Sequence, residues 1–415
     1  MTLDPQWIGP VLATARPAAL GVLLGHFRDL DLAEEAVQTA CLRALKNWPE
    51  RGPPRNPTGW LVTVGRNAGV DGLRRRTRET GLPEELAVEG PEVEDEIQAR
   101  REEADYADDL LRLLFVCCHR ELPPAQQVAL ALRVVSGLGV PQIARAFLVS
   151  EAAMEQRLTR AKRAVTQAGL PFEAPGPLAR EERLGAVLAM VYLLFNEGYT
   201  APQEAAVAKG ALCDEAIRLA RLLLRMFPEE PEVMGLLALL LLQHARAGAR
   251  FDAEGGPVLL EEQDRGLWDR ERIGEGLVLV ARALRLRRPG RFQVEAAIAA
   301  LHARAPSVEA TDWPQVAALY EKLAHLVPSP VVELNRAVAL SRVEGPGPAL
   351  AHVEPLAPAL GGYFYFHGVR GHLLQRLGRG AEAREAYGRA IALARTAAEA
   401  VQIRRYLDQL GGPPA

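Results

Sequence analysis

The spacing of apolar residues predicts helices along almost the whole chain. Apolar positions recur every three or four residues, and Ala and Leu dominate with few β-branched runs, which together favour an all-α fold. The longest apolar stretch, Val233 to Leu242, is about half the length needed to cross a bilayer, so we expect no membrane partner. The clearest helices beyond residue 180 are predicted at Leu184–Phe195, Pro202–Phe227, Pro231–Ala247 and Ile273–Leu286.

A short helix, a tight turn and a longer basic helix follow one another over residues 141–163. This order is typical of a helix-turn-helix, whose second helix enters the DNA major groove. Ser150 is a suitable N-cap for that second helix. An excess of basic over acidic residues over 112–163 favours phosphate binding, although an amphipathic pair with a solvated charged face is the alternative. The inner seam is expected to consist of Ile143, Ala146, Met154 and Leu158.

Two further patterns occur nearer the N-terminus. An acidic helix is predicted over residues 31–46, with Leu32, Ala36, Cys41 and Leu45 as its apolar stripe. After a loop rich in Gly and Pro (51–57), residues 58–76 contain the run Trp-Leu-x-x-x-x-Arg-Asn-x-x-x-Asp-x-x-Arg-Arg. With the helix-turn-helix, these patterns resemble the extracytoplasmic-function (ECF) class of sigma-70-type factors over about the first 170 residues. Such factors have two helical modules, region 2 and region 4, joined by a linker.

The resemblance implies a role for each pattern. The acidic helix corresponds to the part of region 2 that binds the clamp of core RNA polymerase, and Trp60 corresponds to the part that melts and recognises the −10 element. Melting requires captured bases, for which aromatic platforms, amide groups and positive charge are suited. Core-polymerase-binding candidates are Asp31, Glu34, Glu35 and Gln38; candidates for binding −10 DNA are Arg55, Asn56, Trp60, Arg66, Asn67, Arg74, Arg75 and Arg76. Each group has an alternative. Trp60 could be a core residue, the arginine cluster that begins at Arg74 could be a solvated helix end, and the acidic side chains could form a solvated face.

The helix-turn-helix corresponds to region 4, which binds the −35 element. Gln pairs well with adenine and Glu accepts a hydrogen bond from cytosine, whereas Arg157 and Arg160 are expected to contact phosphate. Glu155 departs from the Lys or Arg common in the family, which puts its own role in doubt. Candidates for −35 DNA binding are Glu155, Gln156, Arg157, Thr159, Arg160 and Arg163.

Composition limits the remaining functions. The 415 residues carry a net charge of −3, so positive charge must be concentrated in the DNA-binding modules. Four cysteines and the lack of a secretory signal predict reduced thiols and a cytoplasmic location. Adjacent helical residues point about 100° apart, so Cys117, Cys118 and His119 are not expected to bind metal. With no cofactor motif, nucleophile–base pair or phosphate loop, we expect neither a cofactor nor an enzyme.

Beyond the helix-turn-helix the chain continues through a Pro/Gly-rich junction at residues 169–177. Similar residue patterns then start near positions 316, 349 and 383. Their starting points are 33 and 34 residues apart, which is close to the period of tetratricopeptide repeats. Their concave face is expected to bind a protein or peptide, with Asn335, Arg336, His367 and Arg370 as contact candidates; capping or solvated positions are the alternative. The matched positions are Val316, Tyr320 and Leu323, then Ala349, Val353 and Leu356, then Ala383, Tyr387 and Ala390.

On this wider pattern the chain resembles ECF factors with a C-terminal tetratricopeptide-like extension. We expect a sigma factor for promoter-specific initiation, regulated in cis by that extension. The alternative is a helix-turn-helix regulator with a repeat domain that does not recruit polymerase. The expected domains are region 2 (1–78), a flexible acidic linker (79–109), region 4 (110–172), a helical middle domain (178–290) and the repeats (291–412).

Overall fold

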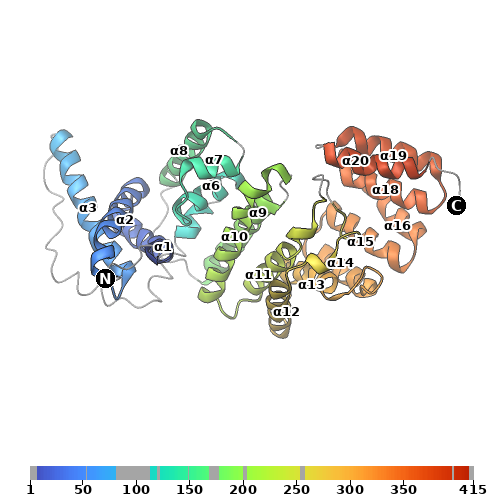
Figure 1. The fold of residues 1–415 in the computed structure, drawn as a ribbon, viewed down its shortest axis with the longest axis horizontal. Helices are drawn as coiled ribbons and strands as arrows, with labels where there is room; N and C mark the ends of the chain where they lie inside the picture. Colours follow the sequence, from blue (N-terminus) through green and yellow to red (C-terminus); the bar gives the residue numbers. More distant parts are fainter. Residues whose placement is uncertain are drawn as a thin grey trace. The chain divides into compact units, whose positions relative to one another are not determined.

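The structure is a computed structural model in which every element described is a helix (Figure 1). The chain forms two compact units, residues 1–197 and 198–415, which are described separately. The predicted all-α fold is confirmed. The structure describes residues 7–52, 54–80, 113–118, 122–147, 149–167, 177–199, 203–252, 258–394 and 397–410.

The first three helices pack against one another in pairs. Asp29 begins α2, because its side chain accepts hydrogen bonds from the backbone N–H groups of Asp31 (2.9 Å) and Leu32 (3.0 Å). Gly52, with φ +76°, ends it. Gly65 allows α3 to approach its neighbours closely, since a Cβ there would lie 2.7 Å from Leu23 and 3.3 Å from the Ala36 carbonyl. The three are α1 (Ile8–Phe27), α2 (Leu30–Arg51) and α3 (Pro57–Thr80).

A helix-turn-helix is present where the sequence predicts it. Gly137 turns the chain after α6 with φ +70°, and Ser150 caps α8 by accepting from the Ala153 N–H at 3.2 Å. The predicted seam residues Ile143, Ala146, Met154 and Leu158 are all buried. The helices are α6 (Pro124–Val134), α7 (Val140–Ala146) and α8 (Glu151–Gln167).

The boundary between the two units falls inside a helix. The helix α9 (Pro177–Tyr199) belongs to the N-terminal unit as far as Glu197, so the units do not divide at the predicted junction. Most of that junction, and the acidic linker beyond α3, lie outside the described residues. The domain limits expected from the sequence therefore stay predictions.

In the C-terminal unit, α11 is the central helix. It is apolar on all sides, every residue from Val233 to Leu242 is buried, and it packs against α10, α12 and α13. The long apolar stretch is therefore a core helix, and among the described residues no helix is long and apolar enough to cross a membrane. The first helices and turns here are α10 (Gln203–Met226), α11 (Pro231–His244), η2 (Ala247–Ala249), η3 (Arg265–Leu267) and α12 (Arg270–Arg285).

Gly235 allows α11 and α13 to approach closely, and the Glu232 carboxylate links them by hydrogen bonds. A Cβ on Gly235 would lie 2.5 Å from the backbone N of Gln293, so the two backbones are in direct contact. Beside this contact, the Glu232 carboxylate accepts hydrogen bonds from the backbone N–H groups of Phe292 (3.0 Å) and Gln293 (3.1 Å). A side chain of α11 thus caps the N-terminus of α13 (Arg291–Arg304).

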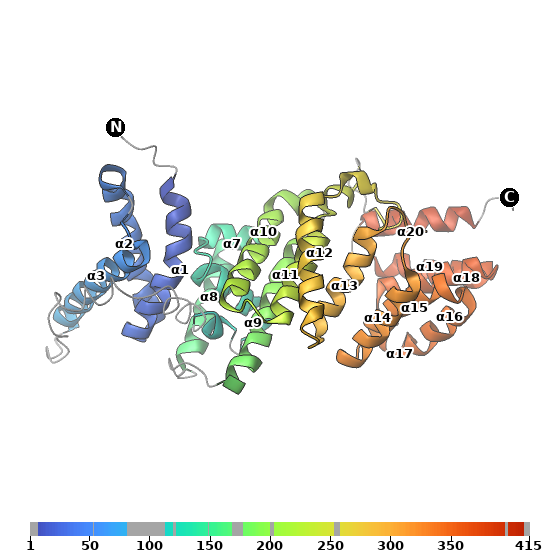
Figure 2. The ribbon, with the colours of Figure 1, turned by 90° about the horizontal axis from the view of Figure 1, so that it is seen from below.

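The last part of the chain is a series of helix pairs, which lie side by side in Figure 2. The matched repeat positions are buried or half-buried, and a Cβ on Gly371 would meet the Tyr387 ring at 2.6 Å. These contacts explain the small and aromatic residues at the repeat positions, while the tetratricopeptide assignment stays a prediction. The helices are α14 (Trp313–Leu326), α15 (Pro330–Val343), α16 (Pro346–Val353), η4 (Glu354–Leu356), α17 (Ala357–Leu360), α18 (Phe364–Arg376), α19 (Gly380–Leu393) and α20 (Ala397–Gln409).

Candidate nucleic-acid interface

Helix α8 presents a polar face away from its buried seam. The side chains of Glu155, Gln156, Thr159, Arg160 and Arg163 are exposed, while Met154 and Leu158 on the opposite side are buried. Arg160 is held along the helix, because its Nε donates to the Gln156 carbonyl at 3.3 Å. This face therefore carries hydrogen-bonding and charged groups that are accessible to solvent.

Arg157 differs from the other candidates of this helix. It is half-buried, and its guanidinium carbon lies 5.5 Å from the centre of the Phe147 ring at the end of α7. A cation–π contact of this kind fixes α8 against α7. Arg157 therefore packs within the module, whereas the expectation placed it on DNA phosphate.

Trp60 lies at the end of a row of three tryptophans. Its ring is edge-on to Trp48 at 5.3 Å, and Trp48 stacks on Trp7 at 6.2 Å. Trp48 is buried and Trp60 is half-buried, so one part of Trp60 belongs to the core and the rest faces outward. The partial burial of Trp60 is compatible with a core role, and its role in capturing a base stays a prediction.

Asn56 has a structural role that the sequence analysis missed. Its Oδ1 accepts a hydrogen bond from the Gly59 N–H at 2.9 Å, and its carbonyl accepts one from the Trp60 N–H at 3.0 Å. Asn56 therefore caps the start of α3 and positions Trp60 one turn later. The spacing Asn-Pro-Thr-Gly, with proline directly after the cap, is the signal that could have revealed it.

The basic residues predicted to follow the −10 strand do not share one environment. Arg55, Asn67 and Arg74 are exposed, but Arg66 is only 7% exposed. Burial does not favour the predicted role of Arg66 in supplying charge along a DNA strand, and that role stays a prediction. The side chains of Arg75 and Arg76 lie outside the described residues.

The acidic helix α2 also differs from its prediction. Asp31, Glu35 and Gln38 are exposed, but Glu34 is only 7% exposed and does not share the solvated face. Its carboxylate Oε2 lies 2.5 Å from Lys162 Nζ, which comes from α8. A neighbour 128 residues away in the sequence cannot be inferred from the pattern of one helix.

The apolar stripe assigned to α2 is wrong at its last position. Leu45 is 51% exposed, because at 100° per residue it lies about 180° from Ala36. It is nearly in line with Gln38, as is Leu42, which is 55% exposed. The exposed face of α2 therefore combines polar groups with two leucines, as protein-binding surfaces do. Helical angles counted from Gln38 could have shown this.

The cysteines near the start of region 4 are core residues. Cys117 and Cys118 are buried, and burial raises the pKa of the Cys118 thiol to about 12. Burial, with a smaller effect of Cys118 and Glu34, raises the pKa of Cys117 as well. Such thiols stay protonated at neutral pH. Within the described ranges no His, Cys, Asp and Glu cluster could hold a metal ion, and His119 lies outside them.

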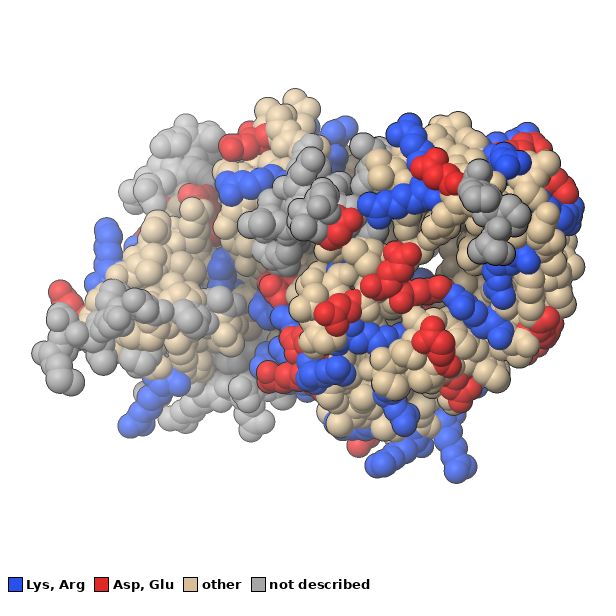
Figure 3. Space-filling view, turned by 45° about the vertical axis from the view of Figure 1, so that its right-hand side comes forward, with Lys and Arg blue, Asp and Glu red and all other residues tan. Residues whose placement is uncertain are grey.

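The contact candidates of the repeats have mixed environments. His367 is 4% exposed, and its Nε2 donates to the Gly361 carbonyl at 2.8 Å, which favours a structural role for this side chain. Arg336 forms ion pairs with Glu321 and Glu333, and Arg370 pairs with Glu354 at 3.0 Å. Asn335 is exposed. On the face shown in Figure 3, acidic and basic side chains are interspersed over the described surface.

Three family models match successive parts of the chain. Sigma-70 region 2 matches residues 12–79, and sigma-70 region 4 matches residues 112–165. A family of unknown function (DUF6596) matches residues 183–284. The first two matches contain α2, α3 and the helix-turn-helix, and the third contains α10 to α12.

Two relatives extend these matches. A protein of Rhizobium meliloti (strain 1021), named as uncharacterized, is 61% identical over 413 residues, which is 99% of this chain and 98% of the relative. The ECF RNA polymerase sigma factor SigJ of Mycobacterium tuberculosis (strain ATCC 25618 / H37Rv) is 36% identical over 167 residues, covering 38% of this chain and 49% of that protein. Sigma-70 proteins bind core RNA polymerase and promoter DNA and are not enzymes. The chain belongs to the sigma-70 family, as an ECF-type sigma factor with a helical C-terminal part.

Proposed function

We propose that this sigma factor directs promoter-specific initiation with the residues described above. The exposed face of α2 binds the polymerase clamp, the start of α3 binds the melted −10 element, and α8 binds the −35 element. The observation that carries the proposal is the division of α8 into a buried seam and an exposed face with Gln156, Thr159 and Arg160. A recognition helix needs both faces, one for its own module and one for DNA.

The polymerase-binding surface of α2 consists of Asp31, Glu35 and Gln38 together with Leu42 and Leu45. Exposed leucines beside polar groups supply apolar contact area, and the charges give orientation. Glu34 belongs to this surface only when its contact with Lys162 is broken.

The −10 element is bound around Trp60. Asn56 fixes the backbone of Trp60 at the first turn of α3, and the Trp48 ring contacts the Trp60 ring. An unstacked base can stack on its outward part, while Arg55, Asn67 and Arg74 lie exposed to contact the strand. A fixed aromatic platform lowers the entropy lost on binding.

The C-terminal helices regulate this activity in cis, in the cytoplasm, and bind a protein or peptide partner. Tethering to the same chain raises the effective concentration of a weak contact to the millimolar range. The exposed Asn335 is the remaining candidate for a partner contact, since His367 is buried and the two arginines are paired.

The proposal is tested by run-off transcription with purified core polymerase on a pool of genomic promoter fragments. Promoter-specific transcripts are expected from the wild type, and none from Glu35→Lys combined with Leu42→Glu. Glu385→Lys on α19, where Glu385 is 66% exposed, is the control for a change of charge. DNA binding without any transcript would instead support a regulator that does not recruit polymerase.

Regulation in cis is tested by two truncations. One ends after about residue 175 and removes α9, and the other ends after Tyr199 and keeps it. Changed transcription from both supports regulation by the C-terminal unit, whereas a change from the shorter protein alone assigns the effect to α9. Wild-type transcription from both, in the tube and in cells, contradicts regulation in cis.

A further inference from the structure

Two short helical turns of the C-terminal unit, η2 and η3, lie against each other and carry three arginines. The Asp269 N–H donates to the Ala245 carbonyl at 2.9 Å and joins the two segments of chain. Arg246 and Arg250 flank η2, while Arg265 begins η3. All three arginines are half-buried. We call Arg246, Arg250 and Arg265 the arginine cluster.

Each arginine of the cluster is held by neutral oxygens at the end of a helix. Arg246 Nη2 donates to the hydroxyl of Tyr199, the last residue of α9, at 2.9 Å. The guanidinium carbon of Arg250 lies 3.7 Å from the centre of the Tyr199 ring, and its Nη1 donates to the Tyr199 carbonyl. Arg265 Nη1 donates to two carbonyls at the end of α13, at 2.5 and 2.7 Å. The positions of the three guanidinium groups are therefore fixed before any ligand binds.

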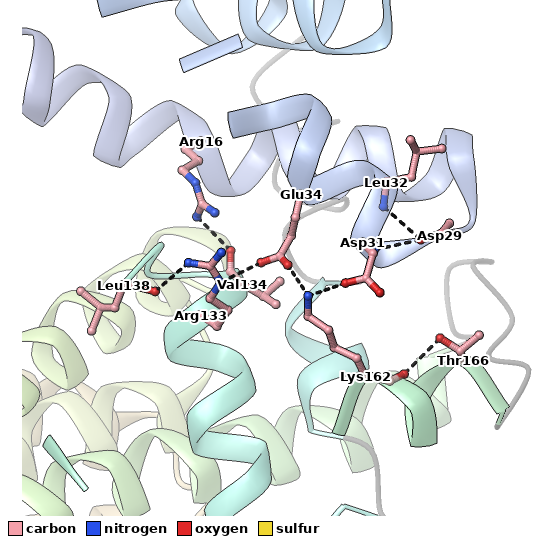
Figure 4. A network of polar contacts seen from close by, with 10 residues as sticks. All are labelled: Arg16, Asp29, Asp31, Leu32, Glu34, Arg133, Val134, Leu138, Lys162 and Thr166. Atoms are coloured by element: carbon pink, nitrogen blue, oxygen red, sulfur yellow. Dashed lines mark hydrogen bonds and ion pairs between the residues drawn. The ribbon is translucent and has the colours of Figure 1, made fainter. Parts of the chain in front are cut away.

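The hydrogen-bond partners of the cluster within the described ranges are not carboxylates. Burial is the main cause that lowers the pKa of Arg250 and of Arg265, and the charge of Arg246 lowers both pKa values further. The charge of the exposed Glu309 acts on Arg265 in the opposite direction. Lys162 is the contrasting case in this chain, because two carboxylate oxygens lie 2.5 Å from its Nζ (Figure 4).

The two helix ends offset only part of the positive charge. A helix C-terminus carries about half a negative charge, so α9 and α13 together supply about one against three guanidinium groups. An exposed carboxylate such as that of Glu309 is screened by water and adds little. Between one and two positive charges are thus left without compensation in a half-buried place, where an anion stabilises them.

The segment 263–268 also contains buried polar atoms that have no hydrogen-bond partner among the described residues. Two are donors, Arg265 Nη2 and Trp268 Nε1, and one is an acceptor, Gln263 Oε1. Trp268 is 3% exposed, and the guanidinium carbon of Arg265 lies 4.7 Å from the centre of its ring. A buried polar atom without a partner is costly, so a native protein rarely keeps one unless a ligand or water completes it. A ligand that completes all three atoms both accepts and donates hydrogen bonds.

A phosphate group meets these conditions better than a carboxylate does. A guanidinium has five N–H donors, and the hydrogen bonds described above use one nitrogen of each arginine, so most donors of the cluster remain available. A phosphate monoester supplies three acceptor oxygens and a charge of about −1.5 to −2 at pH 7, whereas a carboxylate supplies two oxygens and one charge. The hydroxyl groups of a phosphorylated sugar or nucleoside supply the donor that Gln263 Oε1 requires.

We propose that the arginine cluster binds the phosphate group of a small phosphorylated metabolite, with Gln263 and Trp268 beside it. The C-terminal part of this sigma factor then has a ligand site of its own, in addition to the proposed contact with a protein or peptide. The cluster lies wholly within the unit 198–415, so its test does not depend on the proposed contacts with polymerase and promoter DNA.

The first experiment is calorimetric titration of the full-length protein in a low-salt buffer without phosphate. The probes are inorganic phosphate, glycerol 3-phosphate and adenosine monophosphate, each compared with its counterpart acetate, glycerol or adenosine. The phosphorylated probes should bind and their counterparts should not, and a preference for one ester distinguishes a sugar phosphate from a nucleotide. Acetate that binds as tightly as phosphate, or no binding of any phosphorylated probe, overturns the proposal.

The second experiment locates the binding with variants. Arg246→Gln removes a charged donor that makes one hydrogen bond, to Tyr199, and it should weaken binding of the phosphorylated probes about ten- to hundredfold. Arg246→Lys keeps the charge but loses the planar fork, so its affinity should be intermediate. Arg285→Gln, on an exposed arginine of α12, is the matched control and should bind like wild type. Equal affinity of Arg246→Gln and Arg285→Gln overturns the proposal, because phosphate then binds elsewhere.

The third experiment needs no substitution, so it holds even where Arg246→Gln fails to fold. Hydrogen exchange of the wild-type protein is measured by mass spectrometry with and without saturating inorganic phosphate. Exchange should slow in peptides that cover 245–250 and 263–268, and it should stay unchanged in the N-terminal unit. Exchange that does not slow in these peptides, or that slows only in α8, overturns the proposal.

Discussion

The same substitution at two helical glycines should have opposite effects on stability. Gly235→Ala introduces a methyl group at 2.5 Å from the Gln293 nitrogen and 2.8 Å from its Cα, where ordinary contacts are at least 3.4 Å. The backbones of α11 and α13 would have to separate by about 1 Å, which costs about 1–3 kcal/mol for overpacking. Separation also stretches the Glu232 hydrogen bonds, each worth about 1.5–3 kcal/mol because the acceptor is charged. We expect a total loss of about 2–4 kcal/mol.

Gly274→Ala is the matched control in α12. Gly274 is exposed, and nothing lies within 4 Å of a Cβ placed there. The only effect is on helix propensity, so this variant should gain about 0.5–1 kcal/mol.

Both variants are compared with wild type by urea unfolding and by hydrogen exchange with mass spectrometry. Exchange should increase in peptides from α11 and α13 of Gly235→Ala, while peptides from the N-terminal unit stay unchanged. Equal stability of the two variants would refute the close approach of α11 and α13.

Other substitutions test the DNA-binding residues and the packing of the C-terminal unit. Gln156→Ala should change the binding preference at one −35 base pair by about 1–3 kcal/mol. Arg160→Ala should weaken binding to all DNA sequences alike and reduce the slope of log affinity against log salt concentration by about one. Uniform losses of affinity in both titrations would contradict base recognition by Gln156. Trp60→Ala should lose about 1–3 kcal/mol of single-strand binding to a −10 oligonucleotide but keep −35 duplex binding, and unchanged binding of the oligonucleotide would argue against a stacking platform. Burial, and to a smaller extent the charges of Arg246 and Arg265, lower the pKa of His302 to about 4. Between about pH 6.5 and 4, His302 is therefore protonated in the unfolded protein but neutral in the folded protein. The His302 contribution to stability is thus present above about pH 6.5 and is lost towards pH 4, by about 1–3 kcal/mol; a wild-type pH profile that matches His302→Gln would rule this out.

Much of what depends on local pattern could be predicted from the sequence. Helix periodicity gave the fold class, and the alternation around Met154 and Leu158 gave the seam of α8. Ser150 could be recognised as a cap because capping acts within one turn. The repeat positions could be recognised because they pack against each other within one helix pair. The Tyr387 ring lies so close to Gly371 that a larger residue at position 371 would clash with it.

The expectations that the structure does not favour share a different origin, since they concern which face of a helix meets a distant segment. Arg66 and Glu34 look like solvated charges in the sequence, but both are buried, and Lys162 comes to Glu34 from α8. His367 is buried through a hydrogen bond to its own loop, which no periodicity encodes. Leu45 was different, because helical angles alone could have placed it on the exposed face.

The three contacting tryptophans of region 2 provide an intrinsic fluorescence signal. Of the five tryptophans in the chain, Trp7, Trp48 and Trp60 are in contact within one module, so a change at Trp60 alters the surroundings of three of the five emitting rings. Under the proposed function, a base that stacks on the outward part of Trp60 should quench the emission of that ring, while the buried Trp48 stays shielded. If region 2 binds the melted −10 element as proposed, promoter melting can be followed in stopped flow through the intrinsic tryptophan emission, with no dye attached to either protein or DNA.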